Sequence, residues 1–161
     1  MLRGGGVAFG PKPRSFKTGL NGKICDLAWR TALSYRYRQG ELVVLGEGEE
    51  AEVPEWVSRG SRERWVRDLL RHNRFGHPDG RTLFVTGAVR ERLFGSLQEE
   101  GRDARALEVG EVDVKDLLEL GRVVVERGAL ERMFREHESD LAPSERLGAW
   151  ERRMSVQVRG V

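Results

Sequence analysis

The stretch Gly40-Glu41-Leu42-Val43-Val44-Leu45-Gly46 is a short apolar run enclosed by glycines, and it predicts a buried strand over residues 41–45. Three later apolar runs predict further strands, at residues 82–86, 104–109 and 121–126. Helical patterns separate these runs, at residues 20–37, 61–72, 88–98, 113–120 and 129–137. Strands that alternate with helices in this way favour an α/β fold, in which helices cover both faces of a parallel sheet. We therefore predict a three-layer α/β/α fold with a mostly parallel four-stranded sheet and, before it, an extended basic N-terminal arm.

The helix predicted at residues 20–37 has an apolar stripe. Its members recur at helical spacing and are Leu20, Ile24, Leu27, Ala28, Thr31 and Tyr35. We expect this stripe to pack inward, with Lys23 and Arg30 on another face. Asp26 stands four residues before Arg30, a spacing that suits an ion pair within one helix. Gly40 is expected to end the helix.

The remaining segments set the domain organisation. Residues 46–58 hold five glutamates, and we expect an acidic, mobile loop that faces solvent. Asp113 is a residue type that caps helices, so it marks the start of a helix that runs to Leu120. The polar segment after residue 137 is expected to be loose or docked on another surface. The predicted parts are an arm at 1–18, a globular domain at 19–137 and a C-terminal tail at 138–161.

The composition excludes several classes of protein. With 161 residues, of which 39% are hydrophobic and 34% charged, the chain has the size of one soluble domain. No stretch approaches the ~18 consecutive apolar residues that a membrane span needs, so we expect none. Cys25 is the single cysteine, which excludes an internal disulfide and a multi-cysteine metal site and fits a reducing interior.

The first residues are rich in glycine, proline and basic side chains, in the order Arg3-Gly4-Gly5-Gly6-Val7-Ala8-Phe9-Gly10-Pro11-Lys12-Pro13-Arg14. Glycine is costly inside helices and strands, and proline lacks the backbone N–H, so the segment predicts an extended, accessible arm. From Arg3 to Arg38 the chain holds eight Lys or Arg against one acid, a net charge of +7, whereas the whole chain carries +2. This asymmetry indicates a polyanionic partner, RNA or DNA, for that end of the chain.

Aromatic side chains lie among these cations. Phe9 and Phe16 belong to a segment that has no core of its own, so we expect them to insert into a partner or to stack on bases. Trp29 and Tyr35 are interpreted as core residues of the first helix. A second group of arginines, which acidic neighbours dilute, is interpreted as a solvated helix face: Arg62, Arg64, Arg67 and Arg71.

Nucleotide-binding and catalytic sites have little support in the sequence. A dinucleotide-binding loop needs G-x-G-x-x-G between a strand and a helix, but Phe9 stands where the third glycine belongs and no strand precedes it. A phosphate-binding loop ends in G-K-[ST], and here Phe16 precedes Lys17-Thr18. Cys25 and the three histidines show no metal-ligand spacing. We therefore expect no catalytic residue, no metal, no cofactor and no small-molecule ligand.

The arm, the helical stretch Leu20 to Ser34 and the run Gly40 to Val44 together resemble the large-ribosomal-subunit protein L-four family, and residues 29–38 are most similar to its fungal mitochondrial members. The resemblance is specific at residues 3–45 and collinear through about residue 136. It implies a structural constituent of the mitochondrial large ribosomal subunit, not an enzyme, with a cytoplasmic bacterial-type ribosome as the lesser possibility. The implied partners are large-subunit ribosomal RNA and neighbouring large-subunit ribosomal proteins. In the family a first strand and a loop tip precede this motif, so the chain is expected to lack both.

The RNA contacts that the resemblance implies lie on the arm and the helix after it, at Arg3, Gly4, Gly5, Gly6, Lys12, Arg14, Lys17, Lys23 and Arg30. The charge pattern and the aromatic residues add Phe9, Arg36 and Arg38. Two other hypotheses stay open. One is an α/β enzyme that grips a phosphate-bearing small molecule at the glycine-rich segment, and the other is a regulatory role on messenger RNA, by analogy with bacterial relatives.

Overall fold

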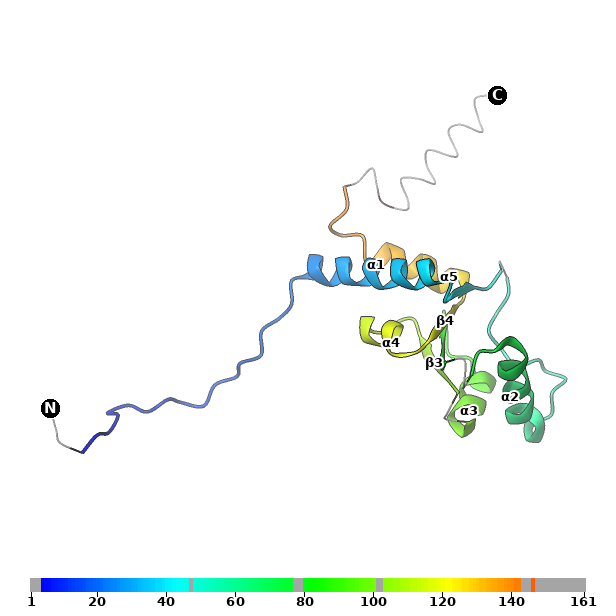
Figure 1. The fold of residues 1–161 in the computed structure, drawn as a ribbon, viewed down its shortest axis with the longest axis horizontal. Coiled ribbons are helices and arrows are strands. Elements are labelled where there is room, and N and C mark those ends of the chain that lie inside the picture. Colours follow the sequence, from blue (N-terminus) through cyan, green and yellow to red (C-terminus); the bar gives the residue numbers. More distant parts are fainter. Residues whose placement is uncertain (1–3, 47, 77–79, 101–102, 143–145, 147–161) are drawn as a thin grey trace, which may run out of the picture.

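The computed structural model describes residues 4–46, 48–76, 80–100, 103–142 and 146 (Figure 1). Four strands form one sheet, and their bounds are Leu42–Val44 for β1, Thr82–Thr86 for β2, Ala104–Glu108 for β3 and Arg122–Val125 for β4. The strand order is β1-β4-β2-β3, and all three pairings are parallel. Parallel neighbours need crossover connections, which the intervening helices supply.

The helices lie where the sequence predicts them, with small differences at their ends. Their bounds are Gly22–Gln39 for α1, Arg62–Asn73 for α2, Glu91–Glu100 for α3, Val114–Glu119 for α4 and Arg127–Glu136 for α5, with a short 3-10 helix, η1, at Arg59–Ser61. The largest difference is at α3, which begins three residues after the predicted start at residue 88.

Helices cover both faces of the sheet. On one face, α1, α4 and α5 bury a cluster that includes Leu33, Leu117 and Met133 together with strand residues such as Val123. On the other face, α2 and α3 bury a second cluster around Phe84 and Val124. Successive residues of a strand point to opposite faces, so β4 supplies Val123 and Val125 to the first cluster and Val124 to the second. The predicted three-layer α/β/α fold is confirmed.

Two predictions about the strand at residues 41–45 and the loop after it are wrong. The strand is an edge strand, only partly covered, because β1 pairs with β4 alone. The acidic loop does not simply face solvent, since Val53 and Val57 are buried beneath α2 and α3. Glu52 accepts a hydrogen bond from the backbone N–H of Leu93 at 3.0 Å and so satisfies a free donor at the start of α3.

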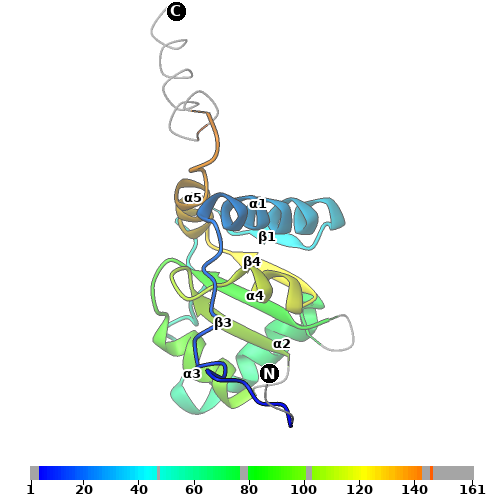
Figure 2. The same ribbon diagram turned by 90° about the vertical axis from the view of Figure 1, so that its left-hand side faces the viewer.

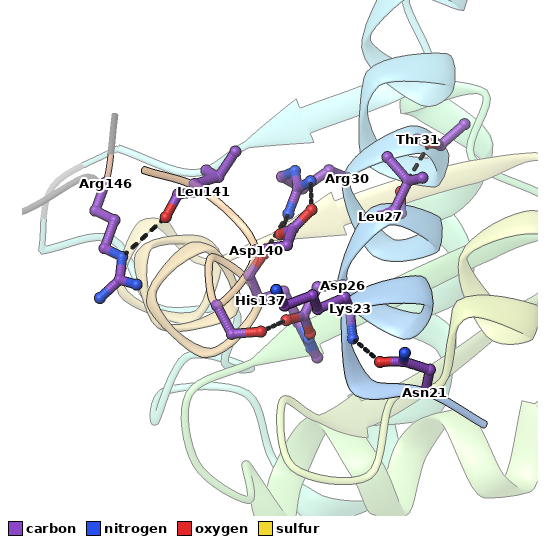
Figure 3. A network of polar contacts seen from close by, with 11 residues as sticks. Asn21, Lys23, Asp26, Leu27, Arg30, Thr31, His137, Asp140, Leu141 and Arg146 are labelled. Atoms are coloured by element: carbon purple, nitrogen blue, oxygen red, sulfur yellow. Dashed lines mark hydrogen bonds and ion pairs between the residues drawn. The ribbon is translucent and has the colours of Figure 1, made fainter. Parts of the chain in front are cut away.

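The beginning of the predicted tail is docked on the body. Residues 138–142 follow α5, and two of them contact α1: Ser139 donates to the carboxylate of Asp26, and Asp140 accepts from Arg30, as Figure 3 shows. The rest of the tail prediction, at 143–145 and 147–161, falls outside the described residues. The division into arm, globular domain and tail stays a prediction.

Within the described ranges, no helix is both long enough and apolar enough to cross a membrane. The same residues contain no group of three or more His, Cys, Asp or Glu side chains arranged to hold a metal ion.

Candidate nucleic-acid interface

The N-terminal arm, residues 4–20, leaves the start of α1 and runs away from the globular body (Figure 1). In Figure 2 the same dark-blue segment passes in front of the body and ends near the viewer. Every residue of the arm is exposed, and none lies in a helix or strand. Within the described part of the chain, the arm makes no hydrogen bond to the body. Its conformation is therefore not fixed by contacts with its own domain.

Three successive glycines set the path of the arm. Gly4, Gly5 and Gly6 have φ angles of 130°, 73° and 127°, in the region that L side chains avoid. No atom lies within 4 Å of a Cβ added at any of them. A side chain here would therefore be disfavoured by backbone strain and not by crowding, and the bare backbone is open to close approach by a partner.

The few contacts of the arm are local. The N–H of Lys17 donates to the hydroxyl of Ser15 at 3.2 Å. The guanidinium of Arg14 lies 5.1 Å from the centre of the Phe16 ring, a cation–π distance. Phe9 is 89% exposed, so its ring has no intramolecular packing. An exposed phenylalanine beside unpaired cations is chemically suited to stacking on a base.

Both ends of α1 are capped by local hydrogen bonds. The side-chain oxygen of Asn21 accepts from the N–H of Lys23 at 3.1 Å, which caps the N-terminus. Gly40 adopts the left-handed conformation at the C-terminus, with φ 71°, and its N–H bonds back to the last turn, as predicted. The helix therefore begins immediately where the arm ends.

The apolar stripe predicted to pack inward is on the wrong face of α1. Ile24 is 58% exposed, and Leu20, Leu27 and Tyr35 are also exposed. The face that packs on the body is formed by Asp26, Trp29, Ala32, Leu33 and Arg36. Polar contacts decide the orientation: Asp26 and Arg36 both find hydrogen-bond partners in the body, and the ring of Trp29 stacks on His137 at 4.4 Å. Tyr35 is accordingly not a core residue.

Arg36 is buried, with 5% of its surface exposed, and this corrects its prediction as an RNA contact. Its Nε donates to the carbonyl of Leu117 at 2.7 Å, and its Nη2 donates to Leu118 at 2.9 Å and to Leu120. These carbonyls lie at the C-terminal end of α4, where no intrahelical donor is left and the helix dipole is negative. Arg36 therefore acts as a cap for α4, with Glu41 as its counter-ion.

Arg30 is also engaged within the chain. Its guanidinium donates to both carboxylate oxygens of Asp140, at 2.5 and 2.6 Å, and to the carbonyl of His137 at 2.8 Å (Figure 3). The hydrogen bond to Asp140 raises the pKa of Arg30 and lowers the pKa of the Asp140 carboxyl. The predicted ion pair within the helix does not take this role, because the carboxylate of Asp26 binds Ser139 and His137 instead.

The other cations predicted to contact RNA lie either along the arm and the first turn of α1 or in the last turn of α1. Lys12, Arg14 and Lys17 lie along the arm and Lys23 lies in the first turn of α1, so these four form one continuous basic track. Arg38 is exposed in the last turn, roughly 20 Å further along the helix at 1.5 Å per residue. None of these five forms a salt bridge with another described residue. Arg3 lies outside the described residues.

Comparison with known proteins gives consistent matches. Residues 1–136 match the model of the ribosomal protein L4/L1 family. The chain is 48% identical over 154 residues to the large ribosomal subunit protein uL4m of Neurospora crassa, which covers 88% of this chain and 47% of that protein. It is 42% identical over 85 residues to uL4 of Petrotoga mobilis, covering 53% and 34%. With uL4 of Amoebophilus asiaticus the identity is 30% over 133 residues, covering 83% and 58%. The chain thus spans about half the length of the curated relatives it matches.

Proposed function

The chain belongs to the ribosomal protein L4/L1 family, and from that premise we propose that it is a structural constituent of the mitochondrial large ribosomal subunit that binds ribosomal RNA. The names of its relatives support the ribosomal setting, and the mitochondrial protein of Neurospora crassa supports the compartment. The observation that carries the proposal is the arm: a fully exposed, basic segment that makes no hydrogen bond to the body within the described residues.

The chemistry of the arm fits an RNA backbone. Lysine and arginine side chains neutralise phosphates and release condensed counterions, which is the main source of affinity for nucleic acids. Glycines allow close approach of the main chain to a phosphate, and the prolines Pro11 and Pro13 reduce the entropy that the arm loses when it docks. A segment that buries nothing by itself gains its order on binding.

The proposed contacts follow the basic track and its neighbours: Arg3, Gly4, Gly5, Gly6, Phe9, Lys12, Arg14, Lys17, Lys23 and Arg38. Arg36 is removed from this set by its burial. Arg30 stays in the set with a smaller expected contribution, because three of the five N–H donors of its guanidinium bind Asp140 and His137. The two arginines instead hold α1 in the orientation from which the arm departs.

The proposal assigns the chain no enzymatic activity, no cofactor and no small-molecule ligand. The alternative enzyme needs acids or a nucleophile near the glycine-rich segment. Residues 4–10 carry no such side chain and are all exposed, and no atom lies within 4 Å of a Cβ added at their glycines. Neighbouring ribosomal proteins are proposed as further partners, for which the exposed stripe around Ile24 and Leu27 is available surface.

The test is a salt series with the full chain and transcribed mitochondrial large-subunit ribosomal RNA. Wild type is compared with Arg14→Ala/Lys17→Ala and with Lys115→Ala/Arg132→Ala, a control that removes the same charge from exposed positions on α4 and α5. The arm variant should lower the slope of log Kd against log salt by about two, one for each lost phosphate contact, and the control by less than one. A shallow slope common to all three proteins would contradict the proposal.

A further inference from the structure

A basic groove lies on the face of the sheet opposite to α1. It encloses about 520 Å³ between η1, the start of α2 and the side of α3, and its lining residues are Arg59, Arg62, Glu91, Arg92, Gly95 and Ser96. The lining holds three arginines against one glutamate, and the positive charge stays in excess even when Glu55, which pairs with Arg92, is included. The set is formed by tertiary structure, since Arg92 is thirty residues from Arg62 in the sequence.

The arginines differ in how they are held. Arg92 is fixed by Glu55, to which its Nη2 donates at 2.7 Å, and by the carbonyl of Val53 at 3.3 Å. Among the described residues, Arg59 and Arg62 have no acidic partner. The Nε of Arg62 is also the one buried side-chain nitrogen or oxygen in the described part of the chain that has no hydrogen-bond partner. An arginine pair left without counter-ions beside a third, fixed arginine is suited to an anion from outside the chain.

An exposed tryptophan, Trp56, comes three residues before Arg59 of this groove in the sequence. Trp56 is 78% exposed and lines a second hollow, whose other lining residues are Val57, Ser58, Ser61, Arg64, Trp65 and Asp68. The segment from residue 56 to residue 62 supplies lining residues to both hollows. A large aromatic surface is costly to leave in water, and beside cations it is a platform on which a base can stack.

We propose that this second surface, made by Trp56, Arg59, Arg62 and Arg92, binds a segment of large-subunit ribosomal RNA with its phosphates in the groove and an unpaired base on Trp56. The inference rests on the proposed function for the identity of the RNA, but it concerns a separate site. The groove lies on the face of the sheet opposite to α1, the helix from which the arm departs, so the two proposed RNA contacts start from different sides of the body. An acidic protein segment is the competing occupant, and it would use the arginines without needing the tryptophan.

The experiment measures binding of the full chain to transcribed mitochondrial large-subunit ribosomal RNA in a salt series. The variants are Arg59→Gln/Arg62→Gln and Trp56→Ala, and the charge-matched control is Lys115→Gln/Arg132→Gln. We expect the arginine variant to weaken binding about tenfold near 100 mM salt and to lower the salt slope by about two, and the control to change neither beyond about twofold. Trp56→Ala should weaken binding about tenfold without changing the slope, because stacking releases no counterions.

Two results would overturn the proposal. The first is an arginine variant that binds RNA like the control. The second is binding of poly-glutamate that the arginine variant loses while its RNA affinity stays unchanged, which would assign the groove to an acidic protein segment. If the double variant unfolds, the single variant Arg59→Gln, at an exposed position, takes its place in the same binding measurement. The arm variant Arg14→Ala/Lys17→Ala separates failure of this proposal from failure of the proposed function. If only the groove is misassigned, that variant still lowers the salt slope of RNA binding. If the chain does not bind RNA through its arm, that variant leaves the salt slope unchanged.

Discussion

The guanidinium of Arg30 binds both carboxylate oxygens of Asp140, 110 residues later in the chain, at 2.5 and 2.6 Å. This pair fastens the segment after α5 to the helix from which the arm departs (Figure 3). A bidentate pair fixes orientation as well as distance. The segment at 138–142 is therefore part of the support of the proposed RNA-binding end.

The first prediction concerns this fastening. Asp140→Asn removes the charge and one of the two acceptor oxygens, so the segment at 138–142 should open more often. Limited proteolysis should then cut in this segment faster than in wild type. Arg30→Gln should produce the same increase, and the double variant should add little to either single change, because both remove one interaction. Additive effects would show that the two side chains act independently.

The second prediction compares two arginines in the last turn of α1. Arg36→Ala leaves the carbonyls at the end of α4 without donors and should lower the free energy of unfolding by about 3 kcal/mol. Arg38→Ala changes an exposed side chain and should leave it within about 0.5 kcal/mol of wild type. Urea unfolding of both variants measures the difference. Equal stability of the two variants would refute the capping role of Arg36.

The third prediction concerns pH. Burial alone would raise the pKa of Glu126, but hydrogen bonds from the N–H of Gly87, from Arg90 and from the N–H of Ala51 outweigh it and lower the pKa below its ordinary value of 4.5. A carboxyl whose pKa is lower in the folded chain stabilises the fold above its unfolded pKa, and this contribution is lost as the pH falls through the folded value.

Glu126→Gln should therefore lower the free energy of unfolding by about 2 kcal/mol at pH 7. The gap to wild type should stay constant down to about pH 5 and narrow below the ordinary pKa of 4.5. Unfolding curves at several pH values measure this gap. A gap that widens on acidification would contradict the sign of the pKa shift.

The fourth prediction concerns the glycine path of the arm. Gly5→Ala should leave the melting temperature unchanged, because residue 5 contacts nothing in the body. It should weaken RNA binding about tenfold, since φ 73° costs roughly 1–2 kcal/mol for alanine if that conformation is kept in the complex. Gly10→Ala is the matched control, at a position with open space and no positive φ. Equal losses for both variants would indicate that the path does not depend on φ at Gly5.

The helices and strands of the fold can be predicted from the sequence because each depends on the pattern of a few neighbouring residues. The apolar run at β2 predicts its bounds to the residue, Asp113 caps α4 by accepting from the N–H of Val114 at 2.7 Å, and Gly40 ends α1. These features need only a few neighbouring residues. Periodicity and capping residues therefore place the elements correctly.

The orientation of α1 is not readable in the same way. The stripe around Ile24 and Leu27 is more apolar than the buried face. The buried face nevertheless holds Asp26 and Arg36, which bind His137 and the carbonyl of Leu117, each more than 80 residues away. The sequence also gives no sign that Arg36 and Arg38 differ, although Arg36 caps α4 and Arg38 faces solvent. Contacts between distant segments decide both cases, and no local pattern records them.

The central claim is that the arm gains its order from RNA and not from its own domain. Hydrogen exchange at the amides of residues 4–20 tests it directly, in the free chain and in complex with transcribed mitochondrial large-subunit ribosomal RNA. We predict exchange at the rate of an unstructured peptide in the free chain and strong protection in the complex, with the amides of β2 protected in both. Protection of the arm in the free chain, or no protection when RNA is bound, would contradict the account.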